Sequence, residues 1–197
     1  MDQYTEYAVE QTCALLAIDS PTGFTHRAAA RVMEVLGGLG YAPALTRKGG
    51  VLCCLNPDAA EDGALLLEAH VDTLGGMVTQ ITGTGRLKLT NLGGMNPNNA
   101  EAENVRVYTR DGRVYTGAFQ LCNASIHVND DYNGAKRSYA GMEVVIDEEV
   151  RSAEDVAALG IEPGDIVCFD PRTTVTPSGY IKSRFLDDKL SVGVLLA

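Results

Sequence analysis

The sequence predicts an α/β domain interrupted by a small all-β module, and three observations support this prediction. First, an apolar run at residues 64–67 leads to His70 and Asp72, as the end of a buried parallel strand would. Second, after residue 75 the pattern changes to short segments of alternating hydrophobicity. Third, the α/β pattern returns at residues 179–197. We therefore expect one domain from residues 1–74 and 174–197, and an inserted barrel-like domain from residues 75–173.

The N-terminal part is expected to contain two helices. The first covers about residues 3–18 and is broken by Ser20-Pro21-Thr22-Gly23, since proline and glycine end helices and favour turns. The second follows Thr25, a candidate N-cap, and ends at the glycines of residues 37–40. Two short strands are then predicted, at 44–47 and 51–55. This order is typical of the start of an α/β sandwich.

The central feature is the predicted strand at Leu65–Leu67, which ends in His70-Val71-Asp72. Open α/β sheets place their ligands at the carboxyl ends of such strands. Because strand side chains alternate, His70 and Asp72 should point to the same side. This spacing suits an imidazole that binds a metal while a carboxylate fixes its ring orientation. The alternative is an ordinary strand end whose histidine hydrogen-bonds locally.

The inserted module should consist of short strands joined by turns. The predicted strands are 77–82, 86–90, 105–109, 114–119, 142–146 and 165–169. Arg110-Asp111-Gly112-Arg113 predicts a hairpin with Asp-Gly as a two-residue turn. A short helix should follow Ser152, which begins a capping box, and Gly160 should end it.

The irregular segment 120–141 contains a second group of candidate metal ligands, His127, Asp130 and Asp131. Polar residues in a loop rich in Asn, Asp and Gly are more typical of a solvated turn, which is the interpretation we favour.

Asp187 and Asp188 lie between a predicted strand and a predicted buried helix. Carboxylates in such a place are costly unless they are hydrogen-bonded, paired with cations or bound to metal. The alternative is an aspartate N-cap partnered by Arg184 or Lys189.

Composition excludes several classes of function. The 197 residues are 45% hydrophobic and 21% charged, as in ordinary globular proteins, and the net charge of −10 argues against nucleic acid as a partner. No apolar run approaches a membrane span, and the first residues lack the pattern of a signal peptide. The five cysteines show no Cys-x-x-Cys spacing, which favours reduced thiols and a cytoplasmic location.

Together, His70-x-Asp72 and Phe185-Leu186-Asp187-Asp188-Lys189 resemble the metal-binding motifs of the TET-type (glutamyl/leucyl) aminopeptidases, which are cytosolic enzymes with two metal ions. Segments 20–23, 159–165 and 181–184 also resemble this family, so the resemblance covers essentially the whole chain. It implies a phosphorylase/hydrolase-like three-layer α/β/α catalytic domain, incomplete here, and a β insert that serves as a dimerisation domain in a homo-oligomer.

The resemblance also implies roles for single residues. His70 is expected to be a metal ligand, Asp72 the catalytic-site carboxylate that orients it, Asp187 the ligand bridging both metals, and Asp188 the residue that shapes the adjoining turn. The cofactors would be two divalent ions, with zinc favoured and cobalt or manganese as alternatives. The substrates would be peptides, attacked at their N-terminal bond by a water molecule that the metals activate.

One departure from the family concerns the general base. The family takes that base, and a further ligand, from a Glu-Glu pair beyond the Asp-Asp motif, whereas this sequence has no such pair after residue 188 and no histidine after His127. Glu148-Glu149 lies in the β insert and is expected to be solvated. We therefore expect no general base in this chain, and no activity from it alone.

Three alternatives remain at this point. Related carboxypeptidases and deacylases also use His-x-Asp, but their extra domain follows more of the metal ligands. Endoglucanase activity would need a carboxylate pair flanking the sugar. The chain could also be a non-catalytic, oligomerising β-module protein.

Overall fold

The computed structural model describes residues 2–58 and 63–197, which form two compact units. Unit 1 consists of Met1–Thr73 and Pro171–Ala197, and unit 2 of Leu74–Asp170. The sequence had suggested boundaries at 74/75 and 173/174. No helix in the described part of the chain is long and apolar enough to cross a membrane.

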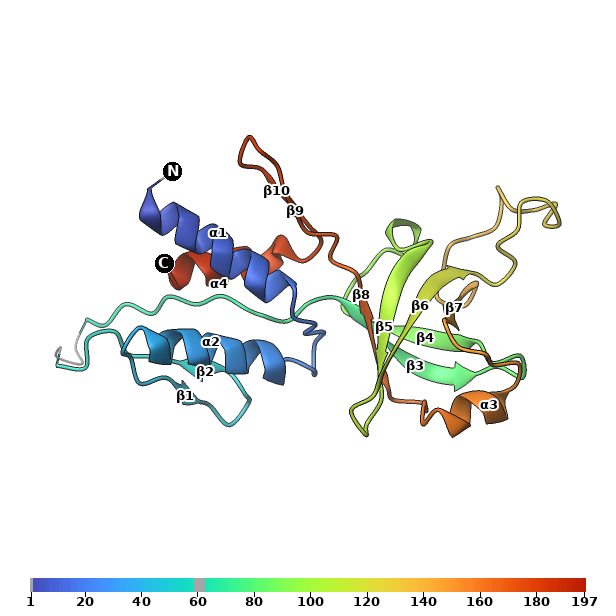
Figure 1. The fold of residues 1–197 in the computed structure, drawn as a ribbon, viewed down its shortest axis with the longest axis horizontal. Coiled ribbons are helices and arrows are strands. Elements are labelled where there is room, and N and C mark those ends of the chain that lie inside the picture. The colour runs from blue at the N-terminus through green and yellow to red at the C-terminus, as the bar shows by residue number, and fades with distance from the viewer. Residues whose placement is uncertain (1, 59–62) are drawn as a thin grey trace. The chain divides into compact units, whose positions relative to one another are not determined.

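Unit 2 is a closed six-stranded barrel, as the alternating pattern predicted (Figure 1). Around the barrel the strand order is β3-β4-β7-β6-β5-β8, and every neighbouring pair is antiparallel. The strands are β3 (Gly75–Ile81), β4 (Leu87–Leu92), β5 (Glu103–Tyr108), β6 (Val114–Leu121), β7 (Met142–Ile146) and β8 (Ile166–Phe169). A short 3-10 helix, η1 (Pro97–Asn99), precedes β5.

The interior of the barrel is filled by alternate residues of its strands. In β7 the buried side chains are Met142, Val144 and Ile146, which follow the two-residue period of a strand with one face inward. Phe119 of β6 and Phe169 of β8 are fully buried and meet edge to face, with ring centroids 5.5 Å apart. This closed, apolar interior gives unit 2 a core of its own.

The hairpin between β5 and β6 is longer than the sequence suggested. The amide of Thr109 donates to the carbonyl of Arg113 at 3.0 Å, so the loop has three residues rather than the two predicted. Gly112 has a φ of 87°, and its amide donates to Thr109 at 3.0 Å. A turn followed by glycine at positive φ is the usual form of a three-residue hairpin loop, and only glycine adopts this conformation at little cost.

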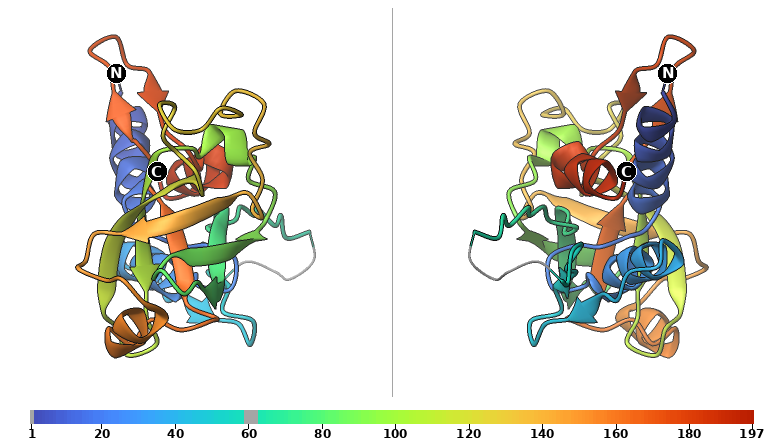
Figure 2. Two further views of the ribbon diagram at one scale, coloured as in Figure 1. Left: turned by 90° about the vertical axis from the view of Figure 1, so that its right-hand side faces the viewer. Right: turned by 90° about the vertical axis from the view of Figure 1, so that its left-hand side faces the viewer.

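The two irregular parts of unit 2 lie at opposite ends of the barrel (Figures 1 and 2). At one end is α3 (Ala153–Ala158), which is capped as predicted: the Asp155 amide donates to Ser152 Oγ at 3.2 Å. Glu148 and Glu149 precede this helix and are exposed, as expected of a solvated pair. At the other end is the loop from Cys122 to Gly141, which contains turns and no helix or strand.

The described residues of unit 1 form three helices and two small hairpins. They are α1 (Gln3–Leu16), α2 (His26–Gly38) and α4 (Leu186–Leu195), with β1 (Ala44–Leu45) paired to β2 (Val51–Leu52) and β9 (Thr174–Val175) paired to β10 (Ile181–Lys182). Its core joins the three helices and consists of Leu15, Val32, Val35, Leu36, Val192 and Leu196. Within it α1 and α4 lie side by side (Figure 1).

The close approach of α1 and α4 depends on Gly193. A Cβ at this position would overlap Thr12 Oγ1 and would lie 2.9 Å from the Ala8 carbonyl oxygen of the facing helix. A glycine at this position therefore lets the two helix backbones come close together.

The prediction of a buried strand at Leu65–Leu67 is wrong for this structure. The segment forms no strand, and the three leucines are 84%, 70% and 60% exposed. A strand inside a parallel sheet takes its hydrogen bonds and its burial from neighbouring strands, and none of the described residues pairs with this segment. For the same reason the three-layer α/β/α arrangement is not seen directly in unit 1.

Candidate metal centre

The predicted site residues come from two segments of unit 1. His70 and Asp72 follow the irregular segment 64–69, and Asp187 and Asp188 stand at the first turn of α4. The backbone of both aspartates is non-helical, and Phe185 before them has a φ of 67°. The chain therefore presents these carboxylates on an irregular turn and not within a regular helix.

The structure brings all four residues together although 117 positions separate His70 from Asp187. His70 Nε2 lies 3.1 Å from Asp187 Oδ1. On the other edge of the ring, His70 Nδ1 lies 3.1 Å from Asp72 Oδ1 and 3.2 Å from the Asp72 carbonyl oxygen. The backbone amide of His70 donates to Asp188 Oδ2 at 3.4 Å. The imidazole is thus held between two carboxylates, one at each nitrogen.

The exposure of these side chains suits a site that is open to ligands. The Asp187 side chain is 95% exposed, that of His70 54% and that of Asp72 38%. Asp72 is the least exposed of the three, and both of its carboxylate oxygens have a partner, as expected of a group that orients a neighbour.

The donor set fits a divalent metal ion in chemistry and spacing. Imidazole nitrogen and carboxylate oxygen are common zinc ligands, each at about 2.0–2.2 Å, so two of them at a tetrahedral angle lie about 3.3 Å apart. The observed 3.1 Å between His70 Nε2 and Asp187 Oδ1 is close to this value. However, residues 2–58 and 63–197 contain no group of three or more His, Cys, Asp or Glu side chains arranged for a metal. His70 and Asp187 are therefore two candidate ligands, fewer than the three typical of a catalytic zinc.

Two further contacts hold the segments that carry the site. Lys189 is only 1% exposed, and its Nζ donates to the carbonyls of Leu15 at 2.9 Å and Ile18 at 2.6 Å. This ties the start of α4 to the end of α1. Thr22 Oγ1 donates to Asp72 Oδ2 at 2.7 Å. The sequence predicted only that segment 20–23 ends the first helix and resembles the family, and did not indicate this contact.

The other candidates from the sequence belong to unit 2 and not to unit 1. His127, Asp130 and Asp131 are exposed and belong to the turns of the Cys122–Gly141 loop in unit 2. Within that loop the Asp131 amide donates to Asn129 Oδ1 at 3.2 Å, as in a solvated turn.

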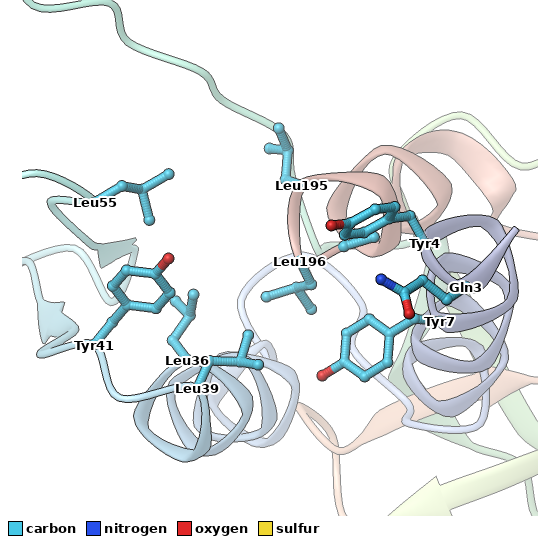
Figure 3. A pocket seen from close by; sticks show the side chains of 10 residues that line it. Gln3, Tyr4, Tyr7, Leu36, Leu39, Tyr41, Leu55, Leu195 and Leu196 are labelled. Atoms are coloured by element: carbon cyan, nitrogen blue, oxygen red, sulfur yellow. The ribbon is translucent and has the colours of Figure 1, made fainter.

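Unit 1 also has an apolar groove of about 570 Å³ (Figure 3). Tyr4 and Tyr7 from α1, Leu36 and Leu39 from the end of α2, and Leu196 after α4 line it. His70, Asp72, Asp187 and Asp188 are not among its lining residues, so the groove and the candidate metal centre are separate features.

Comparison with solved structures gives the fold. An aminopeptidase of the archaeon Desulfurococcus kamchatkensis matches with a TM-score of 0.84 and 25% identity, over 98% of this chain and 51% of that one. The TET1 peptidase of Pyrococcus horikoshii matches with a TM-score of 0.81 and 20% identity, over 96% and 54%. The TET1 structure is described as assembling into a tetrahedron or a large octahedral shell.

Comparison of sequences gives the family. A protein of Bacillus subtilis with the provisional name aminopeptidase YhfE is 41% identical over 182 residues, which is 92% of this chain and 52% of that protein. The chain thus spans about half the length of the relative. Residues 49–197 match the family described as M42 glutamyl aminopeptidase. On this evidence the chain belongs to the M42 glutamyl aminopeptidase family.

Proposed function

We propose that this protein supplies the His70–Asp187 part of a two-metal centre in an aminopeptidase, an enzyme that removes N-terminal residues from peptides. The observation that carries the proposal is the 3.1 Å approach of His70 Nε2 to Asp187 Oδ1. The two residues are distant in sequence, and the first turn of α4 presents its carboxylate to the imidazole. Membership of the M42 family supports the assignment of the activity.

Each residue of the cluster has a chemical task under this proposal. His70 offers Nε2 as a ligand, while Asp72 contacts Nδ1 and so fixes the ring. The two oxygens of Asp187 suit a carboxylate that bridges two cations. Asp188 Oδ2 accepts a hydrogen bond from the His70 amide and so stabilises the turn. When bound, a pair of zinc ions, or of cobalt or manganese, would supply an acidified water and stabilise charge on the peptide carbonyl.

A third ligand and a general base are needed to complete this chemistry. Catalytic zinc typically has three protein ligands, and proton transfer to the leaving amine needs a positioned carboxylate. The described residues place two candidate ligands together, and no third joins them. We infer that residues 1–197 alone bind metal without hydrolysing peptides, and that a complete three-layer catalytic domain is needed for activity.

The closed barrel of unit 2 is the proposed dimerisation domain. It has its own apolar core, so it can present an interface independently of the candidate metal centre. The fold shared with the shell-forming TET1 peptidase supports a homo-oligomer for this protein as well. Because the barrel falls between His70 and Asp187 in sequence, the arrangement favours an aminopeptidase over the related carboxypeptidases and deacylases.

A cobalt titration tests the metal centre. Visible absorption is followed as Co²⁺ is added to the purified protein, to His70→Ala and to Asp187→Asn, with His127→Ala in unit 2 as the matched control. We expect both site variants to lose affinity by more than about tenfold, since even an outer partner of a ligand typically contributes that much. The control should bind as the unchanged protein does.

The outcomes separate the parts of this proposal. Equal affinity of His70→Ala and the unchanged protein would refute the metal centre. Release of N-terminal residues from peptides by the 197-residue chain, abolished in His70→Ala, would instead refute the inferred inactivity and leave the centre intact.

A further inference from the structure

Segment Ser20–Thr22 lies against the segment that carries Asp72. Pro21 and Thr73 form a parallel bridge, in which the Thr73 amide donates to the Ser20 carbonyl at 2.8 Å and the Thr22 amide donates to the Thr73 carbonyl at 3.2 Å. In addition, Ser20 Oγ donates to the Val71 carbonyl at 2.7 Å. Three hydrogen bonds therefore fix the backbone of one segment to that of the other.

This contact is anchored in the interior of unit 1. Ser20 is fully buried and Thr73 is 6% exposed, so both ends of the bridge are shielded from water. The Phe24 amide closes a turn onto the Pro21 carbonyl at 2.7 Å, and Gly23 inside that turn has a φ of 87°. The turn directs the chain away after Thr22, which leaves the Thr22 side chain beside Asp72.

The Thr22 hydroxyl adds a fourth hydrogen bond between the two segments, and this one joins two side chains. The other three use backbone groups or Ser20 Oγ, so they remain when the hydroxyl is removed. The hydroxyl donates to Asp72 Oδ2 at 2.7 Å, while the other carboxylate oxygen, Oδ1, faces His70 Nδ1 at 3.1 Å. Each oxygen of Asp72 therefore has a different partner, and His70 is one of them.

We propose that Thr22 is a positioning residue of the metal centre, whose hydroxyl locks the Asp72 carboxylate so that His70 keeps Nε2 towards Asp187. The inference rests on the proposed function. A carboxylate turns easily about its last side-chain bond, because that torsion has broad minima. A second hydrogen bond from a β-branched side chain, stiff at χ1, removes this freedom. Since the Asp72 side chain is 38% exposed, water would otherwise compete for the same oxygens.

The proposal predicts a specific effect of removing the hydroxyl. Thr22→Val keeps the shape of the side chain and removes the donor, whereas Thr22→Ser keeps the donor. Co²⁺ is titrated into both variants, into the unchanged protein and into His70→Ala, and absorption is recorded. We expect Thr22→Val to need about three- to tenfold more Co²⁺ for half-saturation, somewhat less than is typical for direct partners of a ligand. Thr22→Ser should stay within about twofold of the unchanged protein.

A second measurement distinguishes positioning from a general loss of structure. The Co²⁺ absorption spectrum at saturation should shift in Thr22→Val, because the imidazole orientation changes, and should be restored in Thr22→Ser. Thr22→Ala also removes the hydroxyl but puts no methyl group in its place, so it should repeat the effect of Thr22→Val if the lost hydroxyl is the cause, and should not repeat it if the valine side chain disturbs the fold. Thermal unfolding of each variant identifies such a disturbance.

Each result supports or overturns the inference. Unchanged affinity and spectrum in Thr22→Val, with binding lost in His70→Ala, would refute the role of Thr22 while the metal centre stands. Equal weakening in Thr22→Val and Thr22→Ser would also refute it, because the hydroxyl would then not be the cause. Unchanged binding in His70→Ala would refute the metal centre itself and the inference with it.

Discussion

Asp165 is a buried carboxylate at the start of β8 and illustrates what a single charge does to the barrel. The residue is 1% exposed, and its Oδ2 accepts the Glu162 amide at 2.8 Å. Its Oδ1 is buried and has no hydrogen-bonding partner among the described residues. Burial disfavours the ionised form, and this raises the pKa of Asp165 above its ordinary value. The carboxylate therefore opposes folding at neutral pH.

The expected consequence is that the contribution of Asp165 to the stability of the barrel becomes more favourable as the pH falls. Because the pKa of Asp165 is raised in the folded state, the folded protein binds the proton at a higher pH than the unfolded chain does. The contribution of Asp165 to the free energy of unfolding therefore increases as the pH falls, until the unfolded chain also protonates at pH ~3.9. The control is Asp165→Asn, which cannot titrate. Urea unfolding at several pH values between 7 and 4 gives the free energy of unfolding of both proteins. The value for the unchanged protein should rise relative to that of the variant as the pH falls. A difference that is constant with pH, or that falls, would contradict this prediction.

At the scale of elements, the end of α1 depends on a side chain from α4. The last carbonyls of a helix have no partner within it, and α1 has no basic residue in its last turn. Lys189 supplies both a hydrogen-bond donor and a positive charge at this end of α1. Its ammonium group donates to the carbonyl oxygens of Leu15 and Ile18. One buried lysine thus links the two helices that position Asp187.

Replacing this lysine should destabilise unit 1. Lys189→Met keeps most of the volume but removes the ammonium donor from the carbonyls of Leu15 and Ile18. The Leu15 carbonyl still accepts the Ile18 amide at 3.0 Å, so the free energy of unfolding should fall by about 1–3 kcal/mol. Lys182→Met, at an exposed position on β10, is the matched control and should change stability by less than about 0.5 kcal/mol. Urea unfolding measures both. Equal stability of the two variants would show that the lysine contacts contribute little.

Elements with a clear local sequence pattern were predictable, even where their strand partners are distant in sequence. The strands of the barrel alternate and are joined largely by turns, so the pattern located each of them within a few residues. The capping box at Ser152 has a similarly local cause. The segment 64–67 was not predictable in this way, because an apolar run becomes a strand only where other strands pair with it.

At the scale of the whole molecule, unit 1 carries an unusual amount of exposed apolar surface. Besides the three leucines at 65–67, Leu55 is 61% exposed, Val194 58% and Leu195 43%. Surface of this kind marks a place where other structure packs. Under the proposed function, we expect this surface to be covered by the other parts of a complete catalytic domain.

Hydrogen exchange should reveal the unequal stability of the two units. Amides at Leu65–Leu67 belong to no strand in the described structure, so they should exchange rapidly. Amides of β5 and β6 lie in a closed barrel and should be protected strongly. Mass spectrometry of exchanged peptides compares the two sets within one sample. Protection of Leu65–Leu67 as strong as that of β5 would show that this segment has found a strand partner.

The candidate metal centre was only partly predictable from the sequence. The residue types and the two-residue spacing of His70 and Asp72 pointed to metal chemistry, but nothing local indicated that Asp187 Oδ1 would lie 3.1 Å from the imidazole. Thr22 lies 50 positions before Asp72, and its contact follows from the parallel bridge to Thr73. Long-range pairing of this kind leaves no periodic signal.

The position of the barrel between His70 and Asp187 also sets an order of events during synthesis on the ribosome. After His70 is made, 117 further residues must be added before Asp187 exists. At 5–20 residues per second this takes about 6–23 s, which is long enough for a small barrel to fold. His70 and Asp187 would then come together only after the barrel has folded. A chain still being synthesised could therefore not bind a metal ion through both residues before that point.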